Sequence, residues 1–488
     1  MNTTAHTETN RRILIGGEWL EATDGRTLET VDPATGELLA RVPRGGEAEA
    51  AAAVDAARAA HDAWRSTIPA DRGRLLLAFA SAIRESAEAL ARIETLDTGK
   101  PLKQARGDVQ VAARYFEFYA GLADKLLGTT VPLGADYVDF TTREPFGVSL
   151  QIIPWNYPLQ IGCRGIAPAL AAGNCVVVKP AEEAPLSMLE LGRIAQDVGL
   201  EPGVFNVVTG LGEEAGAALA RHPGVDQITF TGSLETGTAV MRAAAENVVP
   251  VVLELGGKCP NIVFSDANLE EAVPVIARAL IQNAGQTCSA ASRILVASSL
   301  RDALVAQVVA TLRDVSIGKG IDDPDMGPLI SEAQLERVDR MVKDAVRDGS
   351  SLPLGGVRLE GASGGFFFAP TVVTDASPAS AIATHEVFGP VVTVLTFEAD
   401  DERAAVELAN APAGGLVAGV WTRDIRRALR VAASLKVGQV FVNGYGAAGG
   451  VELPFGGFGR SGFGREKGVE GLNSYLQTKN VCIPLADA

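Results

Sequence analysis

Short apolar runs alternate with longer stretches that suit helices between residues 148 and 264 of this 488-residue chain. The runs are a few residues long and rich in valine and isoleucine, which is typical of buried strands. Regular alternation of strands and helices predicts parallel β-α-β units. We therefore expect an α/β fold whose sheet is covered by helices on both faces, with strands at 148–153, 175–179, 204–208, 227–230 and 251–254.

Two further regions flank this alternation. Residues 48–64 and 72–95 are rich in alanine and carry apolar residues at spacings of three and four, which predicts two amphipathic helices that pack closely. A second α/β run fills roughly 258–460. In it we expect helices at 300–315 and through the 330s and 340s, and strands at 292–296, 391–397 and 438–442.

The length and composition indicate a globular protein of two or three domains. Hydrophobic residues make up 47% of the chain and charged residues 21%, which is enough for sizeable cores. Lys and Arg total 43 against 59 Asp and Glu, a net charge of −16. Because the electric field of a strongly negative protein repels phosphate groups, we expect neither nucleic acid nor a membrane as a partner.

The cysteines and the first residues bear on the compartment. The five cysteines form no CxxC pair and show no zinc-like spacing with the four histidines, so we expect neither a disulfide framework nor a metal site. The chain starts with polar residues, and no apolar run is long enough to span a bilayer. We expect a cytoplasmic protein in which four cysteines are small buried hydrophobic residues, namely Cys163, Cys175, Cys259 and Cys482.

The fifth cysteine is the best indication of function, together with one glutamate. Cys288 lies among small and polar residues in Gly-Gln-Thr-Cys-Ser at 285–289, and Glu254 ends an apolar strand at the start of Glu-Leu-Gly-Gly-Lys at 254–258. A thiolate can attack a carbonyl carbon, and a carboxylate can activate the water that later releases the acyl group. No histidine lies in a setting like that of a cysteine hydrolase, so a thiol protease is not expected.

Two further motifs flank these along the chain, Pro-Trp-Asn-Tyr-Pro at 154–158 and Glu-Val-Phe-Gly-Pro at 386–390. The set resembles the NAD(P)-dependent aldehyde dehydrogenase superfamily from about residue 13 to residue 481. The resemblance implies the aldehyde dehydrogenase fold: a Rossmann-like cofactor domain, an α/β catalytic domain and a small β arm for oligomerisation. It also implies a homodimer or homotetramer.

The same resemblance divides the chain. Residues 126–143 alternate polar and apolar side chains like an exposed hairpin, and with a C-terminal strand they match the oligomerisation arm. We assign the arm and C-terminal tail to 126–145 and 461–488. The NAD-binding domain is then 1–125 and 146–256, and the catalytic domain 257–460.

The resemblance implies NAD-dependent oxidation of an aldehyde to its carboxylic acid. Cys288 would form a thiohemiacetal and then a thioester, and Glu254 would activate the water that hydrolyses the thioester. Asn156, just ahead of a helix, would donate its side-chain amide to the developing alkoxide together with the Cys288 backbone N–H. Glu466 resembles a second glutamate that relays protons, with a structural salt bridge as the alternative.

Two other classes remain as alternatives. A branch of the superfamily passes its thioester to coenzyme A, but that branch generally lacks the acid found here as Glu254. A non-catalytic structural protein on the same fold would be marked by loss of Cys288 or Glu254, and both are present.

Candidate cofactor residues follow the strands. Lys179 and Glu182 end a strand at the edge where open α/β sheets bind ligands, and the resemblance implies that they hold the adenosine ribose. A carboxylate on the 2′-hydroxyl repels a 2′-phosphate, so Glu182 favours NAD over NADP; two surface charges beside a turn are the alternative. Gly232 and Ser233 follow another strand and suit a phosphate, with a plain serine N-cap as the alternative.

The resemblance adds further residues to the cofactor site. Glu386 matches the glutamate on the nicotinamide ribose, and Phe388 matches the phenylalanine beside the ring. The other residues that we assign to NAD are Ile153, Trp155, Gly212 and Leu255.

Arg164 bears on the substrate. It follows Asn156 by eight residues on one helix, about 12 Å farther from the chemistry, and it resembles the arginine that binds the carboxylate in succinic semialdehyde dehydrogenases. Gly449 and Gly450 open space in a later loop, so we expect a carboxylated or other polar aldehyde larger than succinic semialdehyde. An aromatic aldehyde is one alternative, and an arginine paired to an acid at a subunit interface is another. We also assign Tyr157, Thr287 and Ser289 to the substrate site.

Overall fold

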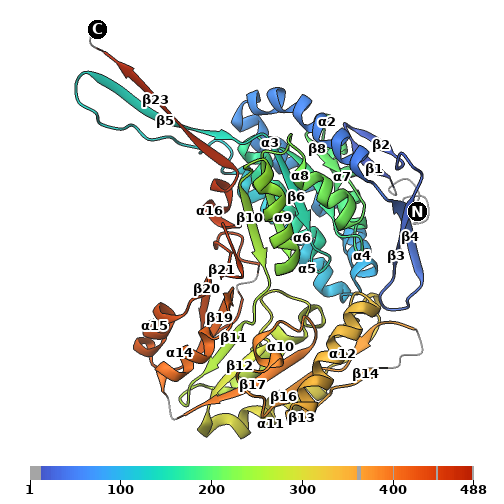
Figure 1. Cartoon of the computed structure of the whole chain (residues 1–488), viewed down its shortest axis with the longest axis vertical. Coiled ribbons are helices and arrows are strands. Elements are labelled where there is room, and N and C mark those ends of the chain that lie inside the picture. The colour runs from blue at the N-terminus through green and yellow to red at the C-terminus, as the bar shows by residue number, and fades with distance from the viewer. Residues whose placement is uncertain (1–11, 360–363, 399–400, 447–448, 486–488) are drawn as a thin grey trace.

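The computed structural model of the protein describes residues 12–359, 364–398, 401–446 and 449–485. Two α/β bodies, each built on its own sheet, stand one above the other, and a two-stranded arm projects from the first body (Figure 1). The predicted α/β class, with helices layered on sheets and a small β arm, is confirmed.

The first sheet has the strand order β2-β1-β8-β7-β6-β9-β10-β22. Its five central strands are mutually parallel, as predicted from the alternation of strands and helices. Every residue of β7 and β8 is buried, which explains their uninterrupted apolar character. The predicted strands are observed within two residues of their expected ends, as β6 (Val148–Ile153), β7 (Cys175–Pro180), β8 (Phe205–Val207), β9 (Gln227–Gly232) and β10 (Val251–Leu255).

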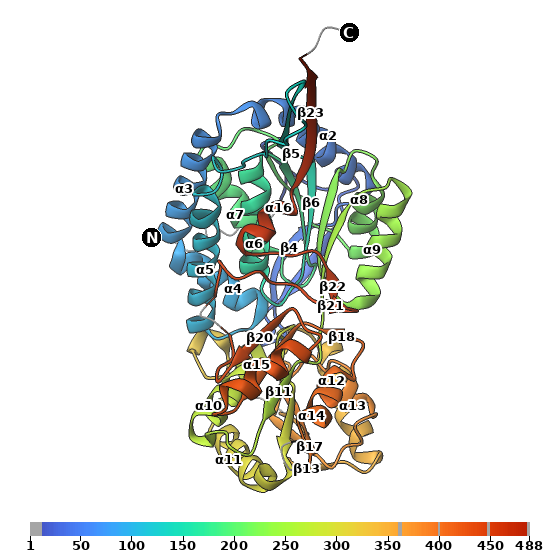
Figure 2. The same ribbon diagram turned by 90° about the vertical axis from the view of Figure 1, so that its left-hand side faces the viewer.

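Helices cover both faces of this sheet. α6 (Pro158–Ala172) packs on one face and α9 (Leu234–Glu246) on the other, with α5 (Leu102–Ala120) outside α6 (Figure 2). The remaining elements of this body are β1 (Ile13–Ile15), β2 (Glu18–Leu20), β3 (Thr27–Val31), β4 (Leu38–Pro43), α2 (Glu47–Ser66), α7 (Leu186–Asp197), η1 (Gly212–Gly216) and α8 (Ala217–Arg221).

The prediction of one helix over 72–95 is wrong. Two helices occupy that stretch, α3 (Pro69–Glu85) and α4 (Ala87–Thr98), and they meet at Ser86. Ser86 has φ −89° and ψ 7°, which ends the first helix and starts the second in a new direction. Both helices thereby bury their apolar faces, as Phe79 and Leu90 show.

The second sheet has the order β13-β16-β17-β12-β11-β19-β20, and all its pairings are parallel except that of β13. Three expected strands and one expected helix are found, as β12 (Arg293–Ala297), β17 (Val391–Phe397), β20 (Gln439–Val442) and α11 (Arg301–Arg313). A second expected helix, through the 330s and 340s, is observed as α12 (Glu332–Arg347). Elements that the pattern analysis missed include β11 (Pro260–Val263), α10 (Leu269–Ile281), β13 (Ser351–Leu354), β16 (Thr371–Thr374), α14 (Glu402–Asn410), β19 (Val417–Trp421) and α15 (Ile425–Ser434).

The arm joins distant parts of the chain. β5 (Tyr137–Pro145) pairs antiparallel with β23 (Leu476–Pro484) along its whole length, so the expected hairpin within 126–143 amounts to one bridge between Thr130 and Phe140. Cys482 is exposed on β23, and its prediction as a buried hydrophobic residue is wrong. The alternating arm has one face open to solvent, and Cys482 lies outside either core.

The C-terminal segment does more than build the arm. Before β23 it contributes β22 (Gly462–Phe463), which pairs antiparallel with β10 and places Gly462 opposite Glu254. It also forms α16 (Gly468–Asn473), which packs against α6. None of the helices in the described part of the chain has the length and apolar character that crossing a bilayer requires.

Candidate active site

Two cavities meet at Cys288. The first cavity has a volume of about 600 Å³ and lies at the ends of β9 and β10, and the second has a volume of about 500 Å³ and lies beside α6 and α10. Cys288 is the only described residue that lines both. The predicted residues that line the first cavity are Trp155, Asn156, Gly232, Ser233, Glu254, Glu386 and Phe388, and those that line the second are Tyr157, Arg164, Thr287 and Ser289.

A strained turn sets the position of the Cys288 thiol. Asn283 and Ala284 both have positive φ, at 48° and 53°, which is unfavourable for residues with a Cβ. Gly285 follows at φ 73°, and a Cβ there would lie 2.1 Å from the Gly389 carbonyl oxygen. Only glycine fits at this point, where the segment runs close to the backbone of Gly389 before it reaches Cys288.

Hydrogen bonds on both sides hold this segment. The Asn156 side-chain amide donates to the Gln286 carbonyl at 2.9 Å, and the Asn283 amide donates back to the Asn156 carbonyl at 2.8 Å. The hydroxyls of Tyr157 and Thr287 are 2.8 Å apart. These contacts tie the start of α6 to the nucleophile segment, so that Asn156 and Cys288 keep a fixed relation.

Two further residues hold the far side of the nucleophile. The Tyr445 hydroxyl donates to the Ser289 carbonyl at 2.8 Å, and the Cys259 thiol donates to the Cys288 carbonyl at 3.5 Å. Cys259 was predicted as a small buried residue, and it is buried. Its sulfur also contacts the backbone of the reactive cysteine, which the sequence did not indicate.

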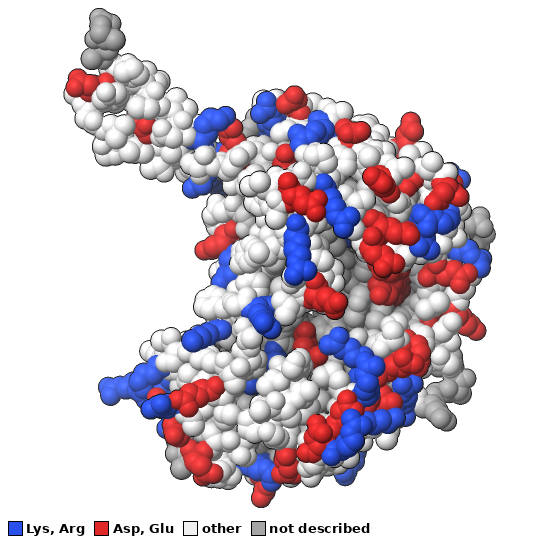
Figure 3. Space-filling model, viewed as in Figure 1, with Lys and Arg blue, Asp and Glu red and all other residues white. Residues whose placement is uncertain are grey.

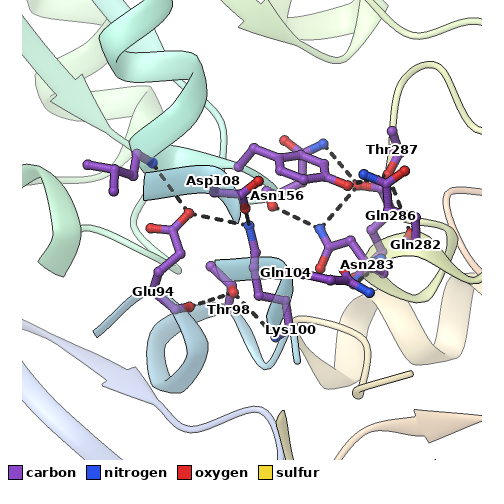
Figure 4. A network of polar contacts seen from close by, with 12 residues as sticks. Glu94, Thr98, Lys100, Gln104, Asp108, Asn156, Gln282, Asn283, Gln286 and Thr287 are labelled. Atoms are coloured by element: carbon purple, nitrogen blue, oxygen red, sulfur yellow. Dashed lines mark hydrogen bonds and ion pairs between the residues drawn. The ribbon is translucent and has the colours of Figure 1, made fainter. Parts of the chain in front are cut away.

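A buried charge cluster supports the site from below (Figure 4). The Lys100 ammonium lies 2.7 Å from Asp108 and 3.3 Å from Glu94, and it stands 4.2 Å from the centre of the Tyr157 ring. Burial raises the pKa of Asp108 to about 6, although Lys100 opposes the rise. Beside this cluster, the Gln104 side chain accepts from the Asn283 backbone N–H at 2.9 Å. α4 and α5 therefore carry the polar base on which both catalytic segments rest.

A second buried cluster joins the candidate base to Arg164. Arg164 forms an ion pair with Glu466, and its guanidinium lies 5.1 Å from the centre of the Phe455 ring. Burial raises the pKa of Glu254 well above its usual range, the nearby Glu466 raises it further, and Arg164 opposes both effects. Burial likewise raises the pKa of Glu466. Burial and the neighbouring carboxyl group thus both favour the protonated form of Glu254.

The thiol is also neutral at rest. Burial raises the pKa of Cys288 to about 12, and the positive charge of Arg164 acts in the opposite direction. A neutral thiol is a poor nucleophile. Attack on a carbonyl therefore requires that the thiol lose its proton, and the positive charge of Arg164 favours the thiolate that results.

The first cavity suits a flat ring and a sugar. Trp155 and Phe388 meet edge to face with centroids 5.2 Å apart. The Glu386 carboxylate packs against the backbone of Gly256, and a Cβ at Gly256 would lie 1.9 Å from that carboxylate. Burial raises the pKa of Glu386 to about 8 and lowers that of the neighbouring Lys258 to about 7. Lys258 lines the cavity without having been predicted.

The other predicted cofactor residues take three different positions. The Lys179 ammonium is 2.8 Å from Glu182, whose second oxygen faces the Gly212 N–H at 3.5 Å. Burial would raise the pKa of Glu182, but Lys179 brings it below its usual value. Ser233 accepts from the Thr236 N–H at 3.1 Å, the N-cap that was the simpler alternative. Two side chains are buried in the core and are absent from the described linings of both cavities, those of Ile153 and Leu255.

With this geometry established, comparison with known proteins decides the family. The sequence profile described as "Aldehyde dehydrogenase family" matches residues 19–481. The chain belongs to the aldehyde dehydrogenase family. The family and the fold that the motifs predicted are thereby confirmed, and the protein is an enzyme of this family.

Relatives of this aldehyde dehydrogenase act on chemically different aldehydes. It is 41% identical over 481 residues to betaine aldehyde dehydrogenase of Bacillus subtilis, covering 97% of each chain. It is 42% identical over 480 residues to human retinal dehydrogenase 2, covering 97% of this chain and 92% of that one. A structure of betaine aldehyde dehydrogenase from Staphylococcus aureus in complex with NAD+ superposes with a TM-score of 0.96 at 39% identity, covering 99% of this chain and 96% of that one.

Several residues of the site carried no signal in the sequence. Tyr445 acts through a backbone contact that depends on three-dimensional position, and Lys100 lies in a helical region far from the motifs. Gln286 belongs to the motif around Cys288, but the motif did not indicate that its carbonyl accepts from Asn156. Lys467 follows Glu466 directly and lines the second cavity. Its place beside a predicted site residue was the only indication available.

We predict that Lys100→Met lowers the free energy of unfolding by about 3–5 kcal/mol, because it leaves two buried carboxylates without their cation. Lys103→Met is the matched control. Lys103 is exposed and pairs with Asp325 at 3.2 Å, so its loss should cost less than about 1 kcal/mol. Guanidinium denaturation of both variants measures the difference, and equal effects would contradict a structural role for the cluster.

Proposed function

We propose that this aldehyde dehydrogenase oxidises an aldehyde to its carboxylic acid through a thiohemiacetal and a thioester on Cys288. The observation that carries the proposal is the position of Cys288 as the one described residue that lines both cavities. A carbonyl carbon bonded to this sulfur stands at the boundary between them. The cofactor can then approach from the first cavity while the body of the aldehyde occupies the second.

The cofactor is NAD. The edge-to-face pair of Trp155 and Phe388 suits the flat nicotinamide ring, and the Lys179–Glu182 pair suits the hydroxyls of a ribose. When bound, NAD accepts a hydride from the carbon attached to Cys288. A solved relative, the betaine aldehyde dehydrogenase of Staphylococcus aureus, holds NAD+.

The chain's own residues supply the other steps. The Asn156 side-chain amide has two N–H groups, and one of them donates to the Gln286 carbonyl. This bond orients the second N–H group toward a developing alkoxide. Neither carboxylate oxygen of Glu254 has a hydrogen-bond partner among the described residues, so the group is free to contact water in the first cavity. Because its pKa is raised, its ionised form is a stronger base than an exposed carboxylate. Glu466 pairs with Arg164 and thereby fixes the position of the positive charge near Glu254.

The second cavity supports two substrate classes. Arg164 lines it, in keeping with a carboxylated aldehyde, although its guanidinium is paired with Glu466. An aromatic aldehyde is the second candidate because five aromatic side chains line the same space, those of Tyr115, Tyr157, Phe441, Tyr445 and Phe455. For the compartment we propose the cytoplasm, since all five cysteines are free thiols.

Two variants test the thioester route. Cys288→Ala should abolish turnover and leave NAD binding intact. Glu254→Gln should release about one NADH per site and then stall, because the thioester forms without the base that activates its hydrolytic water. Stopped-flow absorbance and the mass of the Cys288 peptide report the burst and the acyl adduct. Activity of Cys288→Ala within tenfold of the parent enzyme would overturn the route.

A comparison of the two nicotinamide cofactors tests Glu182. Because Lys179 keeps this carboxylate ionised at the predicted ribose position, it should repel a 2′-phosphate. We expect kcat/KM with NAD to exceed that with NADP by at least about tenfold, and Glu182→Gln to narrow the gap. Equal specificity in the parent enzyme would show that Glu182 does not contact the 2′-hydroxyl.

We further propose that the arm joins subunits into a homodimer or homotetramer. Charged side chains are few toward its tip (Figure 3), and Val138 and Ile483, which pair across the two strands, are both exposed. An apolar two-stranded ribbon with open edges favours pairing with another chain. Light scattering should give two or four times the chain mass, and Val138→Asp with Ile483→Asp should lower it. A monomeric parent would refute the proposal.

A further inference from the structure

The second cavity is positively charged in a strongly acidic protein. Three cationic side chains line it, those of Arg164, Arg278 and Lys467, and no Asp or Glu is found among its described lining residues. The whole chain carries a net charge of −16. A cavity of the opposite sign attracts anions and repels cations, and the effect is large because apolar walls limit screening by water.

The three cations differ in how much charge they offer to a ligand. Arg164 is ion-paired with Glu466 inside the protein, so its charge is largely neutralised. Arg278 is exposed in the last turn of α10 and therefore lies on the solvent side of the cavity. Lys467 is half-buried, and no carboxylate of the described chain lies within ion-pair distance of its ammonium.

Lys467 retains donors for a ligand. Its ammonium donates to the Gly449 carbonyl at 3.0 Å and stands 5.2 Å from the centre of the Phe455 ring. An ammonium has three N–H donors, so two remain. Burial, followed by Arg164, lowers the pKa of Lys467 to about 8, which leaves most of the group protonated at neutral pH.

The backbone directs this side chain into the cavity. Lys467 has φ 61°, in the left-handed region that side chains rarely adopt, and Gly468 follows at φ 59°. This turn sends Glu466 toward Arg164 and the next residue toward the second cavity. Such strain persists only where surrounding contacts impose it, and here the Phe455 backbone bonds both ways to Glu466.

We propose that Lys467 binds a carboxylate at the far end of the aldehyde, with Arg278 attracting the same group at the mouth of the cavity. The inference rests on the proposed function and narrows it to anionic aldehydes. Aromatic and apolar walls then contact the middle of the substrate. A trimethylammonium aldehyde, such as the substrate named for the betaine aldehyde relatives, would be repelled by Lys467 and Arg278 and should bind poorly.

Alkylation of Cys288 tests the charge of the cavity without any aldehyde. Iodoacetate and iodoacetamide both alkylate thiols, but only iodoacetate carries a carboxylate. The alkylation ratio is the rate with iodoacetate divided by the rate with iodoacetamide, measured from the mass of the Cys288 peptide. At Cys288 this ratio should exceed the ratio at free cysteine by about tenfold, because one charge-assisted hydrogen bond contributes about that factor. Lys467→Met should remove most of this excess, and Lys467→Arg should retain it.

Lys125→Met is the matched control, because Lys125 is exposed and pairs only with its neighbour Asp124. It changes the net charge by the same amount and should leave the ratio unchanged. A ratio at or below that of free cysteine in the parent enzyme would overturn the proposal. An equal alkylation ratio in Lys467→Met and the parent enzyme would overturn the proposal as well.

Steady-state kinetics form the second arm. Succinic semialdehyde and 4-carboxybenzaldehyde are each compared with their methyl esters, and betaine aldehyde serves as the cationic substrate. In the parent, kcat/KM should favour each acid over its ester, and Lys467→Met should reduce that preference about tenfold. Oxidation of the aldehydes without a preference for acids refutes the role of Lys467 and leaves the proposed function standing. An anionic alkylation preference with no oxidation of any aldehyde refutes the proposed function instead.

Discussion

One buried guanidinium, that of Arg164, stabilises two buried carboxyl groups at the centre of this enzyme: it pairs with Glu466, and its charge lowers the pKa of Glu254. Glu254 comes from β10, Glu466 from the segment after β22, and Arg164 from α6. Each alone would be costly to bury, and removal of the arginine would leave two acids in a medium that disfavours their charge. The sheet order, with β22 beside β10, and the packing of α6 below them are therefore requirements of the chemistry as well as of the fold.

The same arrangement favours the neutral forms of Cys288 and Glu254. Both groups are buried, and burial raises the pKa of each. A protonated thiol reacts more slowly with oxidants and alkylating agents than a thiolate does. Arg164 lowers the cost of ionising either group, so its pairing with Glu466 tunes reactivity and does more than fill space.

Sequence patterns predicted the first sheet well because its strands are short, buried and separated by clear helices. They failed where the signal is tertiary: α3 and α4 divide at Ser86 without a proline or glycine, and β11 begins at a proline. The motifs singled out Cys288 and Glu254, and the structure places both on the lining of the first cavity. Tyr445 and Lys100 were not singled out, because their contribution lies in contacts to backbone or to residues distant in sequence.

The pairing of β22 with β10 has a consequence for biosynthesis. Gly462 stands opposite Glu254, and Glu466 and Lys467 follow a few residues later. A ribosome that has translated the chain through β20 has therefore made Cys288 and Glu254 but not Glu466, which pairs with Arg164, or Lys467, which lines the second cavity. The complete site therefore forms only after the last segment has been synthesised and has folded back onto the first sheet.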